Sequence, residues 1–377
     1  MPARAAAGPP GTPDAEADAA DAGLVYVCDD QPGISRRRAG RGFCYRMPDG
    51  SLVRDPQTLA RIRALAIPPA YTEVWICTSP RGHLQATGRD ARRRKQYRYH
   101  PHWAQVRDVG KYERLVAFAR RLPKLRRRLR TDLKRPGLPR EKVLAIVVSL
   151  MLDTLARVGN DSYVRENRSY GLTTLRDRHV AFLRGGRARL KFRGKGGQAH
   201  DLEIDDARLA KLVRACQELP GQALFQYRDD DGGVQPVDSG DVNDYLRAAA
   251  GADFTAKDIR TWGGTLHAFR ELAAMPLPEP VCGDVPSERA LAEVRNRVIK
   301  AVAEVLGNTP AVCRKAYIDP RVFAGWEDGS LARAAENARG ARQWEQATLR
   351  FLARARRAAG ATKSTRPGPR SASRPKP

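Results

Sequence analysis

Residues 140–159 read REKVLAIVVSLMLDTLARVG, and this stretch has the periodicity of a buried α-helix. Apolar residues dominate it from Val143 to Leu152, and Gly159 is the residue that favours a helix end. The apolar part is far shorter than the roughly 20 residues that span a bilayer. The stretch therefore predicts a core helix of a mainly helical domain, with Arg157 in its last turn, and no membrane as a partner.

The chain before this helix has a different pattern. Short β-rich runs alternate there with turn signals such as MPDG and SPRG, and the runs are LVYVC (24–28), GFCYR (42–46), EVWICT (73–78) and HLQAT (83–87). After residue 111 the periodicity becomes helical, except in ARLKFRGKGGQAHDLEI (188–204), where alternating apolar residues flank a Gly-rich tip. This exception predicts a β-hairpin with Lys195 near its tip.

These patterns predict an α+β protein with two domains and two tails. A small β-rich N-terminal domain precedes a larger, mainly α-helical domain that contains the hairpin. The Ala/Pro/Gly-rich head and the basic tail have the composition of disordered segments. The expected boundaries are 1–23 for the head, 24–104 for the β-rich domain, 105–352 for the helical domain and 353–377 for the tail.

The charge of the chain indicates a polyanionic partner. The sequence has 68 Lys and Arg against 42 Asp and Glu, which gives a formal net charge of +26. The tail contributes to this charge, but the head is acidic, so the folded body is itself basic. Such a balance favours nucleic acid, and double-stranded DNA is the partner we expect.

The cysteines and the N-terminus bear on localisation. The six cysteines form no C-x-x-C pair, which argues against a zinc site and favours reduced thiols. The head lacks the continuous apolar segment of a secretory signal, and its acidic residues argue against a transit peptide. We therefore expect a cytoplasmic protein, associated with the nucleoid.

Four residues of the helical domain are candidates for chemistry, although each has a simpler explanation on its own. Arg157 could simply interact with the dipole at a helix C-terminus, and Arg260 could simply form a salt bridge on the surface of a helix. Lys195 could simply be an exposed residue of a turn, and Tyr317 could simply pack in the core. Together, in a basic chain, they suit transesterification at a DNA phosphate, because arginines bind phosphoryl oxygens, a lysine can protonate the leaving oxygen and a tyrosine can form the covalent link. This set requires neither a metal nor a nucleotide cofactor.

Tyr317 lies in the stretch GNTPAVCRKAYIDP, residues 307–320. Gly307 is suited to the end of the preceding helix, and Thr309 with Pro310 is suited to the start of a new one. The short helix that results carries Tyr317 nine residues after the polar Asn308.

Long runs of the sequence resemble the type IB DNA topoisomerases, in particular the bacterial and poxvirus-like branch. The resemblance covers residues 25–323 and is carried by RIRALAIPPAYTEVWIC, GHLQATGRDARRRKQYRYHP, RVGNDSYVRENRSYGLTTLRDRHV, FRGKGG, FTAKDIRTWGGT and NTPAVCRKAY. It implies a β-rich domain and a helical catalytic domain that form a C-shaped clamp around duplex DNA, and it favours a monomer. It also implies relaxation of supercoiled DNA through a 3′-phosphotyrosyl intermediate, without ATP or an essential metal.

The resemblance implies a role for each site residue. Arg157 and Arg260 match the arginines that bind the phosphate, Lys195 matches the general acid, and Tyr317 matches the nucleophile. Asn308 stands where the viral and eukaryotic enzymes have a histidine, so a neutral donor replaces a charged one.

The basic run RRRKQYRYH, residues 92–100, matches residues that contact the DNA major groove in poxvirus-like enzymes. A run of charge is often only a solvated surface, but interleaved amide and aromatic side chains can reach base edges. The DNA-binding residues expected from the resemblance are Arg94, Lys95, Gln96, Tyr97, Tyr99, Tyr163 and Lys257.

Three other functions are compatible with parts of the sequence. A tyrosine recombinase uses similar chemistry, but recombinases have H-x-x-R where this chain has Lys257-x-x-Arg260. A rolling-circle nickase would use histidines such as His100 and His102, but Pro101 stands between them where a hydrophobic residue is usual. A basic DNA-compacting protein would explain the charge and leave the four candidate residues without a role.

Overall fold

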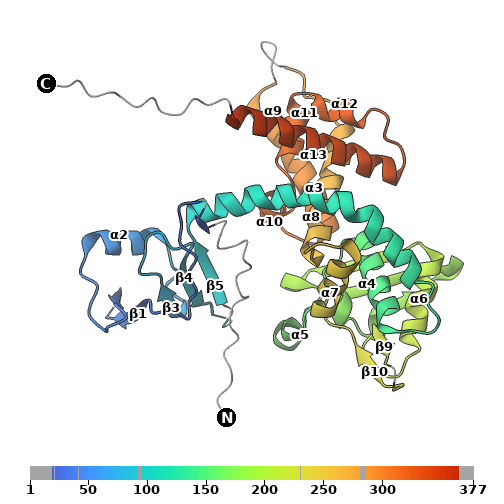
Figure 1. Cartoon of the computed structure of the whole chain (residues 1–377), viewed down its shortest axis with the longest axis horizontal. Coiled ribbons are helices and arrows are strands. Elements are labelled where there is room, and N and C mark those ends of the chain that lie inside the picture. The colour runs from blue at the N-terminus through green and yellow to red at the C-terminus, as the bar shows by residue number, and fades with distance from the viewer. Residues whose placement is uncertain are drawn as a thin grey trace. The chain divides into compact units, whose positions relative to one another are not determined.

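The structure is a computed structural model that describes residues 19–20, 22–40, 42–91, 93, 95–229, 231–280 and 286–364. It contains two compact units, Met1–Tyr112 and Glu113–Pro377, which we call the N-terminal unit and the C-terminal unit (Figure 1). The boundary falls inside the long helix α3 (Pro101–Asp132), which also contains the boundary expected at residue 104. Most of the expected head and the tail from residue 365 lie outside the described residues.

The N-terminal unit is built on one antiparallel sheet with the strand order β2-β1-β3-β4-β5. Helix α2 contributes Ile62 to a core that also contains Ile34 and Ile76. The elements of this unit are β1 (Ile34–Ala39), β2 (Gly42–Arg46), α2 (Pro56–Ala64), β3 (Thr72–Ile76), β4 (Leu84–Arg89) and β5 (Lys95–Tyr99). The β-rich character and three of the expected strands are thereby confirmed.

One expectation for this sheet is wrong, and two of its strands, β1 and β5, were not predicted. The run 24–28 forms no strand, and only Val25 makes an isolated bridge, to Gly82. Strand β1 was not predicted because three consecutive arginines hide its alternation, and β5 was not predicted because it lies within the basic run 92–100. One of the three arginines of β1, Arg36, is used structurally, because its guanidinium donates hydrogen bonds to the carbonyls of Pro68 and Tyr71.

The C-terminal unit is mainly helical, as expected from the sequence. Its helices after α3 are α4 (Arg140–Thr154), α5 (Asp161–Asn167), α6 (Ala207–Gln217), α7 (Ser239–Ala250), α8 (Ala256–Ala273), α9 (Glu288–Leu306), α10 (Pro310–Ala316), α11 (Arg321–Glu327), α12 (Ser330–Ala335) and α13 (Ala341–Ser364). The last of these extends beyond residue 353, where the tail was expected to begin. In the described part of the chain, no helix is both long and apolar enough to cross a membrane.

Helix α4 is a buried core helix of this unit (Figure 1). Every residue from Val143 to Val148 is buried, because α4 contacts α6, α7, α8, β8 and β9. The helix ends earlier than the sequence predicts, at Leu155, which adopts a left-handed conformation with φ 53°. Arg157 is therefore not in the last turn of α4 but in the extended segment that follows it.

The predicted hairpin is confirmed. Strands β6 (Val180–Phe182), β7 (Ala188–Arg193) and β8 (Ala199–Ile204) form an antiparallel sheet, and the turn between β7 and β8 begins at Lys195. Gly196 and Gly197 follow with φ of 75° and 81°, a conformation that favours glycine. A second hairpin, β9 (Gln226–Arg228) with β10 (Val234–Pro236), precedes α7.

Helices α9 and α10 follow the local rules read from the sequence. Helix α9 ends at Gly307 with φ 56°, and Thr309 caps α10 by accepting a hydrogen bond from the N–H of Val312. Pro310 is the first residue of α10, and Tyr317 is the residue that ends it.

Candidate active site

Arg157 and Asn308 meet at the end of α9. One Nη of Arg157 donates to the carbonyl of Gly307 at 3.1 Å, and the other donates to Oδ1 of Asn308. The backbone of Arg157 is positioned by a segment outside α4. The carbonyl of Arg157 accepts a hydrogen bond from the N–H of Leu172 at 2.9 Å. The position of Arg157 thus depends on pairing with a segment that follows it in the chain.

Two glycines allow this pairing. Gly159 has φ 110°, and a Cβ on it would lie 2.8 Å from Oγ1 of Thr173. A Cβ on Gly171 would lie 2.5 Å from the nitrogen of Gly159. The two backbone segments approach so closely that only glycine fits at both positions.

Arg260 lies on α8 and is 4% exposed. Its guanidinium donates to the carbonyl of Leu306 at 2.8 Å and to the carbonyl of Leu155. It therefore ties the end of α9 to the end of α4, next to Asn308 and Arg157. The guanidinium carbon also lies 5.3 Å from the centroid of the Tyr317 ring, within the range of a cation–π contact.

The two arginines form a positive site that no acidic side chain neutralises in the described part of the chain. Neither guanidinium has a carboxylate partner among the described residues. Burial lowers the pKa of Arg260, and burial together with the charge of Arg260 lowers the pKa of Arg157. Arginine remains protonated even so. Two desolvated cations this close together favour a bound anion with several oxygens, such as a phosphodiester.

Asn308 offers this site a further donor. The residue is 9% exposed, and its Oδ1 is already occupied by Arg157. Its Nδ2 is buried and has no hydrogen-bond partner in the described part of the chain. A buried donor of this kind is costly unless it finds an acceptor. The amide also lies within reach of the buried thiol of Cys313, a weak acceptor. Asn308 is therefore a candidate donor to a bound anion.

Tyr317 is held by its backbone. The carbonyl of Tyr317 accepts a hydrogen bond from Oγ1 of Thr265 on α8 at 3.3 Å. The same oxygen of Thr265 accepts from the N–H of Asp319 at 3.1 Å. The side chain of Asp319 is fully buried and pairs with Arg321 at 2.6 Å. The residues around the tyrosine are therefore anchored to α8 and α11, and its ring is half-buried.

Gly263 and Gly264 also build the site, although the sequence analysis assigned them no role. A Cβ on Gly263 would lie 2.3 Å from Cδ2 of Leu155, and a Cβ on Gly264 would lie 2.8 Å from the carbonyl oxygen of Tyr317. Paired glycines inside an amphipathic helix are the signal that could have revealed this close approach. They let the segments that carry Arg157 and Tyr317 pack against α8.

The family resemblance implies that Tyr317 cleaves DNA, and on that expectation Gly264→Ala should slow cleavage by about 10²-fold, the cost of displacing a reacting group by about 1 Å. The new methyl group must push the backbone of Tyr317 away from α8, and Gly264 itself is buried. The measurement is the single-turnover cleavage rate, together with the affinity for DNA, which should stay within about twofold. Gly340→Ala is the matched control because a Cβ there meets nothing within 4 Å. Cleavage at the wild-type rate by the Gly264 variant would show that this contact does not position Tyr317.

Lys195 is exposed at the hairpin tip, and its Nζ lies 5.2 Å from the centroid of the Tyr163 ring. In the part of the chain that the structure describes, no hydrogen bond or ion pair joins Lys195 to Arg157, Arg260 or Asn308. The structure thus brings four of the candidates together and leaves the lysine on a separate, exposed element.

The expected DNA-binding residues fall into two groups. Lys257 is exposed on α8, one turn before Arg260, and Tyr163 is 38% exposed on α5 beside Lys195. Both residues belong to the C-terminal unit, which also carries the site.

The second group lies on the edge strand β5 of the N-terminal unit. Tyr97 and Tyr99 are each 40% exposed, with ring centroids 6.1 Å apart on one face of the strand. Lys95 forms an ion pair of 2.6 Å with Asp29. Gln96 donates to a carboxylate, that of Asp90, at 3.1 Å, and Arg94 lies outside the described residues.

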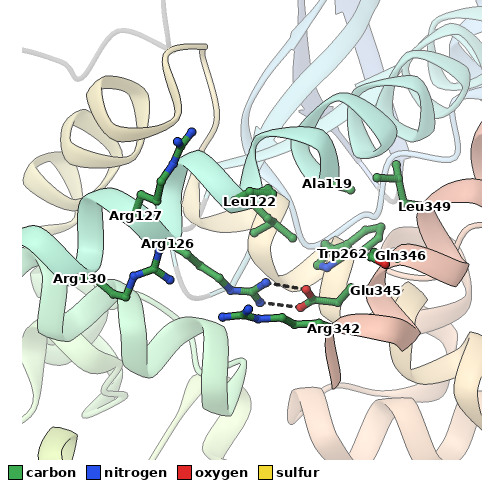
Figure 2. Close-up of a pocket in the computed structure, with 11 residues that line it drawn as sticks. Ala119, Leu122, Arg126, Arg127, Arg130, Trp262, Arg342, Glu345, Gln346 and Leu349 are labelled. Atoms are coloured by element: carbon green, nitrogen blue, oxygen red, sulfur yellow. Dashed lines mark hydrogen bonds and ion pairs between the residues drawn. The ribbon is translucent and has the colours of Figure 1, made fainter. Parts of the chain in front are cut away.

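A cavity of about 530 Å³ lies on the other side of α8, between α3 and α13 (Figure 2). Trp262 lines it, and Trp262 is two residues from Arg260 and so faces the opposite side of the helix. Arg126 and Glu345 close it with two hydrogen bonds of 2.5 Å (Figure 2). None of the candidate site residues lines this cavity, so it is separate from the candidate site.

Comparison with known proteins assigns the family. A family model described as "Eukaryotic DNA topoisomerase I, catalytic core" matches residues 100–332, and one described as "Bacterial DNA topoisomerase IB, N-terminal domain" matches residues 42–90. A protein named DNA topoisomerase 1B from Acanthamoeba polyphaga mimivirus is 32% identical over 290 residues, which cover 76% of this chain and 85% of the relative. The chain belongs to the type IB DNA topoisomerase family.

This type IB topoisomerase has further viral relatives. DNA topoisomerase I of Monkeypox virus and DNA topoisomerase 1B of Vaccinia virus (strain Copenhagen) are each 23% identical over 256 residues, covering 66% of this chain and 73% of the relative. The family resemblance read from the sequence is confirmed. Membership makes the topoisomerase an isomerase that acts on DNA, and it sets aside the recombinase, the nickase and the compacting protein.

Proposed function

We propose that this topoisomerase relaxes supercoiled duplex DNA by reversible transesterification at Tyr317. The phenolic oxygen attacks a backbone phosphorus, so a phosphorus–oxygen bond to tyrosine forms and the bond to the 5′ oxygen breaks. The strand is left with a 3′-phosphotyrosyl link and a free 5′-hydroxyl. Torsional strain then drives rotation of the free end, and attack by the 5′-hydroxyl reverses the reaction and releases the tyrosine.

The observation that carries this proposal is the pair of guanidiniums without carboxylate partners beside the tyrosine. Arg157 and Arg260 would bind the non-bridging oxygens, whose charge grows in the transition state. Asn308 would add the Nδ2 donor that has no other partner among the described residues. The arginines supply the positive charge that the reaction needs, so we expect no essential metal.

Proton transfer completes the mechanism. The phenol loses its proton as it attacks, and Arg260, 5.3 Å from the ring, stabilises the negative charge that develops. Lys195 would give its proton to the departing 5′ oxygen as general acid, a role typically worth 10²–10⁴-fold. Because Lys195 is exposed on a hairpin tip, DNA can reach it without any rearrangement of the buried site.

We also propose how the enzyme holds its substrate. The two units would close around double-stranded DNA as a C-shaped clamp, with the exposed Tyr97 and Tyr99 reaching the major groove. The enzyme would act as a monomer, because every proposed catalytic residue belongs to the C-terminal unit of a single chain. It would act in the nucleoid, where its DNA substrate lies.

The test is relaxation of a negatively supercoiled plasmid by the purified chain in EDTA and without ATP. Transesterification exchanges one phosphoester bond for another, so the reaction should proceed without an energy source. Relaxation that stops in EDTA would contradict the proposal, as would relaxation without a covalent protein–DNA adduct after rapid denaturation.

We expect Asn308→Asp to slow cleavage by about 10²-fold. The substitution keeps an oxygen that can accept from Arg157, but it replaces the Nδ2 donor with an anionic oxygen facing the phosphate. Loss of one donor aimed at a reacting phosphate or acyl oxygen costs about 10²–10³-fold in other enzymes. Asn308→His is the matched control, since it offers the donor that the family resemblance implies at this position, and it should retain most of the activity. Equal rates for the Asp variant and the wild type would remove Asn308 from the mechanism.

A further inference from the structure

His200 lies on β8, between the hairpin tip and the phosphate-binding loop. Its ring stacks on Phe192 of β7, with centroids 4.8 Å apart and an angle of 11° between the planes. A Cβ on Gly194 would lie 2.5 Å from Cδ2 of His200, and a Cβ on Gly307 would lie 2.3 Å from its Cε1. The imidazole therefore touches the backbone of both glycines.

The two glycines are the neighbours of catalytic residues. Gly194 immediately precedes Lys195, and Gly307 immediately precedes Asn308. The carbonyl of Gly307 also accepts a hydrogen bond from Arg157. One side chain thus connects the element that carries the proton donor with the loop that binds the phosphate.

The imidazole of His200 is uncharged where it contacts these two glycines. Burial lowers the pKa of His200, and the nearby charges of Arg157 and Arg260 lower it further. At neutral pH the imidazole therefore adds no third positive charge beside the two arginines.

We propose that His200 is a positioning residue that holds the Lys195 hairpin against the Asn308 loop, so that the proton donor and the phosphate-binding groups meet at one phosphate. This inference rests on the proposed function. It differs from that function because it assigns His200 a role in placing Lys195 rather than in the reaction itself.

The test compares two substrates in single-turnover cleavage. In one, the scissile 5′ oxygen is natural, and in the other it is replaced by a bridging sulfur. A thiolate is a far better leaving group than an alkoxide, because a thiol has a pKa of about 8.5, and it departs without a general acid. A variant that misplaces Lys195 should thus cleave the oxygen substrate slowly and the sulfur substrate at nearly the wild-type rate.

We expect His200→Ala to cleave the oxygen substrate about 10²-fold more slowly than the wild type. With the sulfur substrate its rate should return to within about threefold of the wild type, at unchanged DNA affinity. Equal slowing on both substrates, or wild-type rates on both, would overturn the inference.

Gly194→Ala tests the same contact while His200 stays in place. Gly194 has an extended backbone with φ −93°, which alanine adopts without strain, so the effect comes from the collision with the imidazole. This variant should also cleave the oxygen substrate slowly, and its cleavage rate should be restored with the sulfur substrate. The double variant with His200→Ala should lose no more than either single variant, because the two changes disrupt one contact.

Lys195→Ala separates the inference from the proposed function. If sulfur rescues Lys195→Ala but neither His200→Ala nor Gly194→Ala, the inference fails and the proposed role of Lys195 stands. If sulfur fails to rescue Lys195→Ala, the proposed role itself is wrong.

Discussion

Tyr317→Phe is expected to abolish the covalent adduct and plasmid relaxation while it leaves DNA binding within about twofold of the wild type. The substitution removes one oxygen atom and nothing else. The half-buried ring keeps its contact with Arg260, and the hydrogen bond from Thr265 goes to the backbone of Tyr317. Loss of a catalytic nucleophile costs on the order of 10⁶-fold in other enzymes, so the residual rate should be undetectable.

The measurement is adduct formation on an end-labelled duplex, resolved after denaturation, with filter binding for affinity. Tyr227→Phe is the matched control, because Tyr227 lies on β9 of the same unit and belongs to no part of the site. An adduct formed by the Tyr317 variant would assign the nucleophile to another residue.

Arg260→Ala is expected to slow cleavage by about 10²–10³-fold and to destabilise the C-terminal unit as well. The rate falls because a donor to the transition-state charge is lost. Stability falls because the guanidinium also satisfies the carbonyls of Leu155 and Leu306, and a buried acceptor without a partner costs about 1–3 kcal/mol. Both effects follow from one side chain that serves structure and chemistry together.

Two comparisons separate these effects. Arg157→Ala should slow cleavage by a similar factor with less loss of stability, because Arg157 is only half-buried. Arg289→Ala should change neither quantity, since its side chain is 91% exposed on α9. Thermal denaturation and the single-turnover rate are the two measurements. A normal cleavage rate in Arg260→Ala would leave this arginine with the structural role alone.

Several elements could be predicted from local sequence because local interactions decide them. The apolar run of α4, the Gly-rich tip before β8 and the Thr309–Pro310 start of α10 each carry a signal within a few residues. The end of α4 could not be predicted, because the chain after Leu155 leaves the helix to pair with the segment around Leu172. That pairing joins residues that are distant in sequence.

The sequence by itself determined the family, the helical and β-rich parts of the chain, its charge, and candidate roles for Arg157, Lys195, Arg260, Asn308 and Tyr317. Only the tertiary structure decided which atoms of these side chains are available. In the folded chain Oδ1 of Asn308 accepts a hydrogen bond from Arg157, whereas Nδ2 has no hydrogen-bond partner among the described residues. The tertiary structure also brings Gly264 against the backbone of Tyr317, and it places His200 in contact with both Gly194 and Gly307. The reason is physical: residue type and spacing set local conformation and charge, whereas burial, close approach and hydrogen-bond partners depend on segments that meet only when the chain folds.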